Sequence, residues 1–188
     1  MIIAQTPARD FHADNRYSLA ASEEVFWMAV YRKAFSNLLR CELCTDLTKQ
    51  RQGIDRVLYL SNGRTLYIDE KKRAREYSDI LLEYTSAKER NTPGWIEKDL
   101  AIDYLAYGFM QSQRCYLFPW AMLRRAWTQY GDTWKAKYKE VVARTQVSNF
   151  TYQTLSVPVP IDVLRRAVST AAVIDVSKEF SANGQQEQ

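Results

Sequence analysis

A run of charged residues follows two strand-like segments in the first half of this sequence. Asp55 lies at the start of one segment, Ile54–Leu60, and the next segment, Thr65–Ile68, leads directly into Asp69-Glu70-Lys71-Lys72-Arg73. Two carboxylates from neighbouring strands can bind a hard divalent cation, and an amine beside them can orient or help deprotonate a water molecule. Residues of these types are what hydrolysis of a phosphodiester requires.

The two segments are joined by Ser61-Asn62-Gly63, and Asn-Gly favours the positive φ angles of a tight turn. We therefore expect an antiparallel hairpin that brings Asp55 next to the charged run. With a two-residue turn, Asp55 faces Glu70, with Lys72 on the same face. With a three-residue turn closed by Gly63, Asp55 faces Asp69, with Lys71 on the same face.

Side-chain alternation favours the three-residue turn, because it gathers aliphatic side chains on one face. The other face then holds Asp55, Asp69 and Lys71 together with Val57, Tyr59 and Tyr67. The aliphatic face would contain Leu58, Leu60, Leu66 and Ile68. A lysine two residues after an acid projects from the same face of a strand. We keep Glu70 and Lys72 as the alternative pair.

An Asp at the start of one strand, followed by (D/E)-x-K at the end of the next, resembles the signature of the PD-(D/E)XK nuclease superfamily. Asp55 and Asp69-Glu70-Lys71 occupy those places, and the wider pattern over residues 50 to 120 is similar to small bacterial and phage-type members. Ile54 replaces the proline that gives the superfamily its name, at a position where other residues are tolerated.

The resemblance implies an α/β fold with a mixed central β-sheet flanked by helices, restriction-endonuclease-like. It also implies a nuclease that depends on Mg²⁺ or Mn²⁺ and cuts DNA in preference to RNA. Asp55 and Asp69, with Glu70 as the alternative, would hold the metal, and Lys71 would position the water. Members often cut both strands as dimers, so a homodimer is one expectation, although the sequence itself leaves the oligomeric state open.

Glu83 lies within a strand-like segment, Asp79–Tyr84, where an unpaired buried carboxylate would be costly. It either joins the metal site or pairs with a basic residue such as Arg73 or Arg75.

Glu23 and Glu24 follow Ser22, a residue typical of a helix N-cap. The first helix of superfamily members often supplies an acid to the metal site, so one of the two could complete it. The alternative is that both simply interact with the positive end of the helix dipole.

Basic residues beside the acids could contact phosphates. Lys72, Arg73 and Arg75 follow the hairpin, and the formal charge of +4 suits a polyanionic partner without requiring one. Two alternatives to a DNA nuclease stay open: a non-catalytic nucleic-acid-binding or assembly protein with a nuclease-like fold, and a nuclease acting on RNA. The plainest alternative is a solvated strand end whose surface ion pairs contribute little.

The 188 residues, 46% of them hydrophobic, suit one domain over residues 1–180 and a polar, disordered tail over 181–188. No apolar run is long enough for a bilayer, and three cysteines do not suggest a disulfide framework, so we expect a cytoplasmic protein without membrane contact.

We expect a central sheet of about five or six strands that includes the hairpin. We expect helices that start at Ser22, span Trp95–Ala101, run from Pro119 to a stop at Gly131, span Thr133–Arg144 with an exposed lysine ridge, and span Ile161–Val173. We expect further strands over Asp79–Tyr84, Asp103–Met110, Arg114–Phe118 and Phe150–Val159. The prolines of the last strand place it at a sheet edge.

Overall fold

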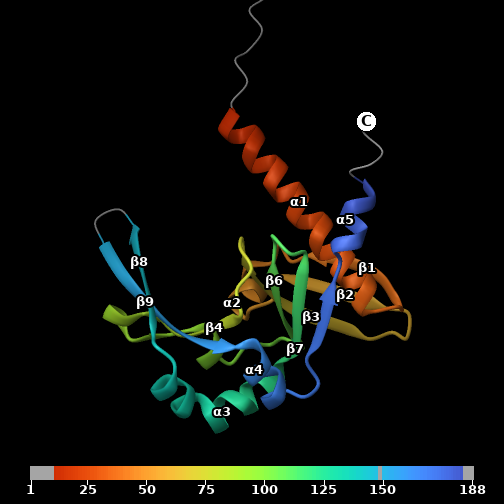
Figure 1. The fold of residues 1–188 in the computed structure, drawn as a ribbon. Helices are drawn as coiled ribbons and strands as arrows, with labels where there is room; N and C mark the ends of the chain where they lie inside the picture. Colours follow the sequence, from red (N-terminus) through yellow and green to blue (C-terminus); the bar gives the residue numbers. More distant parts are fainter. Residues whose placement is uncertain (1–10, 148–149, 184–188) are drawn as a thin grey trace, which may run out of the picture.

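The computed structural model describes residues 11–147 and 150–183 of the chain (Figure 1). The helices are α1 (Phe11–Ala34), α2 (Leu47–Arg51), α3 (Trp120–Lys137), α4 (Ile161–Ala167) and α5 (Ser177–Asn183), and two 3₁₀ turns are η1 (Lys88–Arg90) and η2 (Trp95–Glu97). The strands are β1 (Leu38–Leu43), β2 (Arg56–Leu60), β3 (Thr65–Arg73), β4 (Asp79–Ala87), β5 (Thr92–Pro93), β6 (Tyr104–Phe109), β7 (Arg114–Pro119), β8 (Val141–Val147), β9 (Phe150–Pro160) and β10 (Ala172–Asp175).

The strands form two sheets. A six-stranded sheet has the order β1-β2-β3-β6-β7-β10, and a four-stranded sheet has the order β5-β4-β9-β8. In the larger sheet β3 and β6 run parallel while the other neighbours run antiparallel, so the sheet is mixed. The expected α/β class with a mixed central sheet and flanking helices is therefore confirmed.

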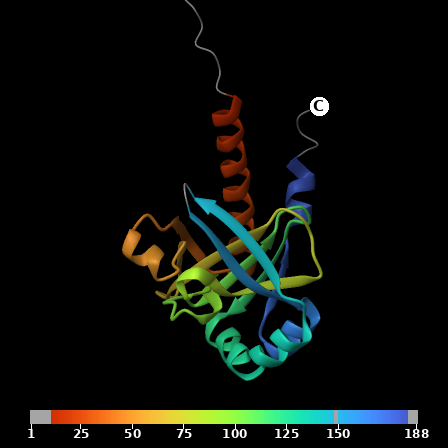
Figure 2. The same ribbon diagram turned by 90° about the vertical axis from the view of Figure 1, so that its left-hand side faces the viewer.

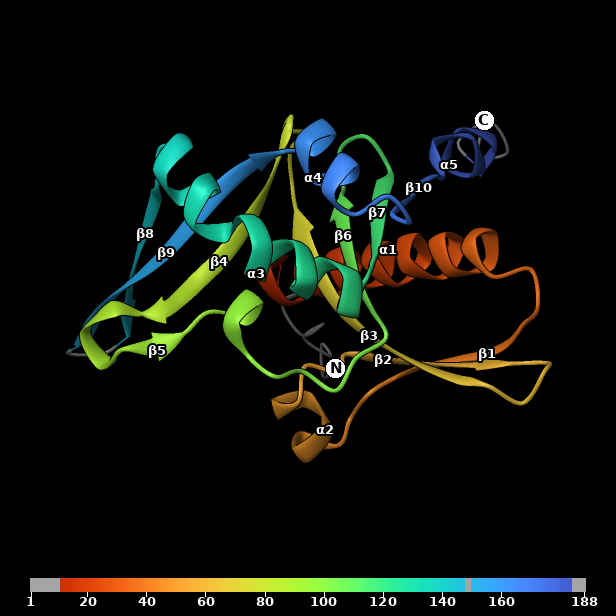
Figure 3. The same ribbon diagram turned by 90° about the horizontal axis from the view of Figure 1, so that it is seen from below.

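Each face of the six-stranded sheet has its own hydrophobic core. Figure 1 shows α1 above this sheet and α3 below it. Phe26 and Tyr31 of α1 pack against Leu58 and Ile68 on one face. The other face packs against α3 and the second sheet, and Figure 3 shows this side of the molecule from below. The core on this face includes Leu105, Phe109, Phe118, Leu123, Trp127, Ile80 and Val157. The residues of β2 and β3 that alternate between these faces therefore meet different surroundings.

The hairpin of β2 and β3 has the three-residue turn that the alternation favoured. Leu60 donates its N–H to the carbonyl of Arg64, Gly63 has a φ of 80°, and Arg56 pairs with Ile68. This register places Asp55 opposite Asp69. The two-residue alternative, in which Asp55 faces Glu70, is wrong.

The strand from Asp79, expected in the central sheet, belongs to the second sheet instead. Its neighbours are β5 and β9, while β6 takes the place beside β3. Local alternation shows that a segment is a strand but does not say which sheet it joins, because pairing is set by distant residues. Figure 2 shows β8 and β9 as a long hairpin crossing in front of the central strands.

Two helix boundaries differ from the expectation. The first helix begins at Phe11, so Ser22 lies inside α1 and is not an N-cap. The helix from Trp120 continues through Gly131 to Lys137, and the residues after it form strand β8. Gly131 is buried within α3 against the ring of Trp127, where a side chain would be crowded by that ring.

Three smaller expectations are corrected in the same way. The ridge of Lys135, Lys137 and Lys139 is split, since α3 ends before Lys139, and the helix expected over Trp95–Ala101 is only the 3₁₀ turn η2. Strand β1 was not anticipated, and the segment Ile161–Val173 divides into α4 and β10.

At the C-terminal end, helix α5 extends to Asn183, and the rest of the tail expected to be disordered lies outside the described residues. The prolines of β9 lie in its second half, beyond Ser156, where β8 no longer pairs with it, so that half is an edge as expected. None of the described helices is long and apolar enough to cross a membrane.

Candidate active site

The candidate site lies where β2 begins and β3 continues past it. Asp55 donates its backbone N–H to the carbonyl of Ile68 at 2.9 Å, immediately before β2 starts at Arg56. The chain before it turns away at Gly53, which has a φ of 83°. Beyond Asp69, β3 therefore keeps β6 on one side but has no β2 residue on the other. This break in the pairing leaves room for side chains to do chemistry.

Asp69 is the most deeply buried acid of the site, with 2% of the residue exposed. One carboxylate oxygen accepts a hydrogen bond from Nζ of Lys71, and the other, Oδ2, is buried without a hydrogen-bond partner. Burial raises the pKa of Asp69 to about 7, although Lys71 acts to lower it, and the nearby Asp55 adds to the increase. An unpaired buried carboxylate oxygen is costly, so this atom is suited to a ligand.

Asp55 is only half buried, and its Oδ2 accepts a hydrogen bond of 2.8 Å from the backbone N–H of Glu70. This bond fixes the side chain of Asp55 beside β3. Asp55 also lines a pocket of about 260 Å³, so this carboxylate can be reached from solvent, although neither Asp69 nor Lys71 lines the pocket. The other residues that line this pocket are Glu23, Trp27, Leu43, Cys44, Gln50, Glu70 and Lys72.

On the opposite face, a buried ion-pair network holds α1 to the hairpin. Arg56 is fully buried and donates from Nε to Glu70 at 2.6 Å and from its two terminal nitrogens to Glu24 at 2.8 and 2.9 Å. Tyr31 donates its hydroxyl to Glu70 at 2.7 Å. Burial opposes the charge on Arg56, but its bonds to the two acids outweigh it and raise the pKa of the guanidinium.

Glu70 is therefore occupied by a structural role. Both of its carboxylate oxygens accept hydrogen bonds from Arg56, at 2.6 and 3.4 Å. Burial raises the pKa of Glu70, and the bonds from Arg56 and Tyr31 act against that increase. The prediction that Glu70 binds the metal loses its basis, because the alternative register that led to it is wrong.

The sequence reasoning missed Arg56 and Tyr31. The available signal was the position of Arg56 on the same face of β2 as Leu58 and Leu60, where a charge requires a buried partner. What could not be read from the sequence was that Glu24 of α1 would be one of those partners.

The two acids of the first helix pair with basic residues of the hairpin. Glu23 contacts Lys72 at 2.5 Å, and Glu24 contacts Arg56. Both lie more than two turns inside α1, so the suggestion that they interact with the positive end of the helix dipole is wrong. Glu23 lines the same pocket as Asp55 but is held by Lys72.

Glu83 lies on the second sheet and meets neither of its expected partners. Ser86 donates its hydroxyl to Glu83, and the two line a pocket with Arg90, while Arg73 pairs with Asp79. Among residues 11–147 and 150–183, no three Asp, Glu, His or Cys side chains gather closely enough to hold a metal ion. Glu83 therefore does not join Asp55 and Asp69.

The basic residues expected to contact nucleic acid are partly engaged. Lys72 pairs with Glu23, and Arg73 contacts Asp79 at 2.8 Å and lies 3.4 Å from the ring centroid of Tyr77. Arg75 is exposed and has no ion-pair partner in the described part of the chain. Because exposed ion pairs are weak, Lys72 can exchange Glu23 for a phosphate at little cost.

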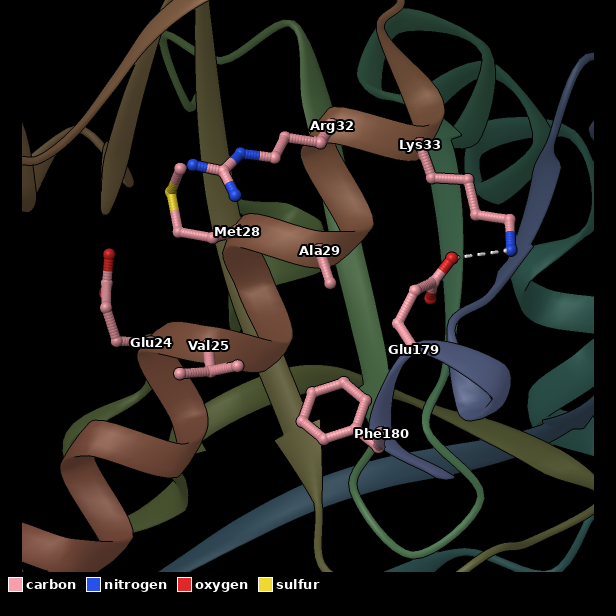
Figure 4. Close-up of a pocket in the computed structure, with 8 residues that line it drawn as sticks. All are labelled: Glu24, Val25, Met28, Ala29, Arg32, Lys33, Glu179 and Phe180. Atoms are coloured by element: carbon pink, nitrogen blue, oxygen red, sulfur yellow. Dashed lines mark hydrogen bonds and ion pairs between the residues drawn. The ribbon is translucent and has the colours of Figure 1, made fainter. Parts of the chain in front are cut away.

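A larger pocket, of about 640 Å³, lies between α1 and α5 (Figure 4). Its walls are mainly apolar, with Val25, Met28 and Phe180, and its ion pair joins Lys33 to Glu179 at 3.0 Å. It does not contain Asp55, Asp69 or Lys71. The smaller pocket includes Asp55 but neither Asp69 nor Lys71, so the candidate site is defined by the acids and the lysine themselves and not by either pocket.

Comparisons of this chain with models of protein families, with curated proteins and with solved structures found no match. The assignment of the site therefore depends on the geometry of its own residues.

Proposed function

We propose that this protein is a metal-dependent nuclease with a restriction-endonuclease-like sheet, and that it hydrolyses phosphodiester bonds of DNA in preference to RNA. The observation that carries the proposal is the position of Asp55 directly opposite Asp69, with Lys71 on the same face. In support, β3 lies inside a mixed sheet covered by helices on both faces, as the resemblance to PD-(D/E)XK nucleases implies.

The two acids fit a hard divalent cation such as Mg²⁺ or Mn²⁺. Oδ2 of Asp69 is a buried acceptor without a partner, and Asp55 offers a second carboxylate beside an open pocket. Mg²⁺ is commonly bound by one or two carboxylates and keeps several waters, so a third protein ligand is not required. When bound, the ion would neutralise the negative charge that develops on the phosphoryl group.

The chain's own residues would prepare the water and the phosphate. Lys71 lies two residues after Asp69 on the same face of β3, and its side chain is about one third exposed, so its amine is accessible to water beside Asp69. As a donor it would hold the attacking water, and in its neutral form it would take the water's proton. The backbone N–H of Glu70 would keep Asp55 in place. Lys72 and Arg75, which follow Lys71 in the sequence, would contact the phosphate backbone.

The test is an assay of plasmid and linear DNA cleavage with Mg²⁺. Asp69→Asn and Lys71→Ala should each lower the cleavage rate at least about 100-fold while DNA binding changes little, because they remove a charge stabiliser and a proton acceptor. EDTA should abolish cleavage. Asp132→Asn, which changes an exposed aspartate of α3, is the matched control and should cut like the wild type. Cleavage that persists in both site variants would overturn the proposal, and a labelled RNA substrate shows which nucleic acid is preferred.

One observation favours a second candidate, a non-catalytic nucleic-acid-binding protein with a nuclease-like fold. Lys71 already pairs with Asp69, so part of the site is neutralised by the protein itself. Such a protein would bind DNA without a metal, and its affinity would fall steeply as salt is raised. Binding measured with and without EDTA therefore separates the two candidates.

A further inference from the structure

The strand β1 forms an outer edge of the six-stranded sheet. Its neighbour is β2, and no other strand of the described residues pairs with its outer side. Natural proteins usually protect such edges, but two leucines on β1 are largely exposed, Leu39 at 72% and Leu43 at 60%. Leu47, in α2 just after the strand, is 68% exposed. An unpaired edge that carries apolar side chains is suited to strand pairing with another chain.

The backbone of β1 determines which residues could pair. Cys44 donates its N–H inward to the carbonyl of Asp55, at 2.8 Å. Because backbone groups alternate along a strand, those of Glu42 also point toward β2, and those of Cys41 and Leu43 point outward. The register with β2 shifts between Leu38 and Arg40, so Leu39 lies in a bulge and the regular outer edge runs from Arg40 to Leu43.

A second copy of this chain could pair antiparallel with that edge in three short registers that match outward groups with outward groups. One register places Arg40 opposite Arg40 of the second copy, and another places Glu42 opposite Glu42. The third is centred on Cys41. It places Arg40 opposite Glu42 twice and brings Leu43 of each copy to the bulge at Leu39 of the other. Like charges directly opposite each other are unfavourable, and opposite charges and apolar pairs are favourable. The third register is therefore the self-complementary one.

We propose that two copies of this protein associate through β1, antiparallel and centred on Cys41, to form a continuous sheet across the dimer. On one face, Leu43 of each copy would pack at the bulge that holds Leu39 of the other. On the other face, Arg40 and Glu42, which already form an ion pair of 3.1 Å within each strand, would join in a network of four charges. A two-fold axis through Cys41 satisfies all of these contacts at once.

The interface also lies beside the candidate active site. Leu43 contributes to the wall of the pocket that Asp55 lines. The second copy would thus add surface at the edge of each pocket without covering Asp69, which lies on the other side of β2. The paired stretch is only about five residues long, so the association should be weak and depend on concentration.

The test is sedimentation velocity of the full chain in reducing buffer, over protein concentrations from about 1 to 200 μM. The wild type should shift from monomer to dimer across this range. Arg40→Glu and Glu42→Arg should each weaken dimerisation at least about 10-fold, because each places like charges opposite each other in the homodimer. An equimolar mixture of these two variants should dimerise again, since unlike charges then face each other at both places. Arg64→Glu, an exposed charge reversal in the hairpin turn, is the control and should behave as the wild type.

A wild type that stays monomeric throughout the range would overturn the proposal, and so would a dimer that neither reversal weakens. A mixture that fails to dimerise when each single variant is folded would also overturn it, with circular dichroism showing the fold. The measurement does not involve catalysis, so the dimer proposal and the nuclease proposal can each be overturned without the other.

Discussion

Asp69 combines two properties that are usually kept apart, because it is almost completely buried and one of its oxygens has no partner. A carboxyl group in this position lowers the stability of the fold when it ionises, and Lys71 offsets that cost only in part. A protein without a use for the charge would be more stable with an amide or an aliphatic side chain there. The cost of Asp69 is therefore itself an argument for function.

The raised pKa of Asp69 gives a prediction for stability. In the folded protein this pKa is about 7, against an ordinary value of 3.8, so between these two values the folded state holds a proton that the unfolded state has lost. The free energy of unfolding should therefore fall as the pH rises through this window, and Asp69→Asn should remove that contribution. Between pH 5 and pH 8, the free energy of unfolding of Asp69→Asn should rise by about 2–4 kcal/mol relative to that of the wild type. Urea unfolding without divalent ions measures this difference.

Asp132→Asn is again the control for this measurement. Lys135 lowers the pKa of Asp132, so this group titrates below the window and its substitution should leave the slope unchanged. If Asp69→Asn and the wild type lose stability in parallel from pH 5 to pH 8, Asp69 does not titrate in this range.

At the scale of elements, the part of the fold that the sequence predicted well is the part that local chemistry determines. Asn62 and Gly63 determine the turn, and the gathering of Leu58, Leu60, Leu66 and Ile68 on one face fixes the register, so Asp55 and Asp69 could be placed opposite each other. The pairing of Glu24 with Arg56 joins residues 32 positions apart and left no local pattern.

The second sheet shows the same limit. Strand β4 pairs with β9, whose residues come more than 60 positions later, and α3 continues through Gly131, which lies against the ring of Trp127. Neither fact follows from local propensity, since a glycine after a helical pattern more often ends the helix. The elements near the site were thus predictable, and those that enclose it were not.

Gly94 offers a test of how the second sheet is joined to the loop before the central strand β6. Its N–H donates to the carbonyl of Tyr84 at 2.9 Å, and a Cβ built at this position would lie 2.2 Å from the carbonyl oxygen of Glu83. Backbone atoms of β4 cannot move aside as a flexible side chain can. We expect Gly94→Ala to lower the free energy of unfolding by about 2–3 kcal/mol in urea denaturation, as the loop separates from the strand.

Gly63→Ala is a useful comparison for this variant. Gly63 has a φ of 80° but nothing within 4 Å of an added Cβ, so only the cost of its left-handed conformation applies, about 1 kcal/mol. An equal loss of unfolding free energy in the two variants would mean that β4 accommodates the Cβ added at position 94 more easily than its contacts indicate.

On the scale of the whole molecule, the candidate site lies where separate parts of the chain meet. Ala101 donates its N–H to the carbonyl of Gln52, and Asp103 accepts from the N–H of Tyr67 through its side chain, so the loop that leaves the second sheet is tied to the hairpin. On the other face, Arg56 ties α1 to the same hairpin. The backbone around Asp55 and Asp69 is thus tied to neighbouring elements on both faces, which is the support that the proposed metal ligands would need.

This arrangement predicts that a divalent ion stabilises the whole fold. An ion that binds only the folded state raises the free energy of unfolding by an amount that grows with its concentration. At pH 8, where Asp69 is ionised, 10 mM Mg²⁺ should raise the melting temperature by about 3–5 °C if its dissociation constant is about 1 mM. At pH 5.5 the proton on Asp69 competes with the ion, so the increase should be much smaller.

Differential scanning fluorimetry measures both increases, with NaCl at equal ionic strength as the reference for general salt effects. Asp55→Asn and Asp69→Asn should each abolish the Mg²⁺-dependent increase at pH 8, since each removes one of the two carboxylates. Asp79→Asn removes the ion-pair partner of Arg73, which is not one of these two acids. This variant should keep the Mg²⁺-dependent increase even if its melting temperature without Mg²⁺ is lower. An increase that survives in both site variants would place the ion elsewhere on the protein and leave Asp69 without a ligand to explain its burial.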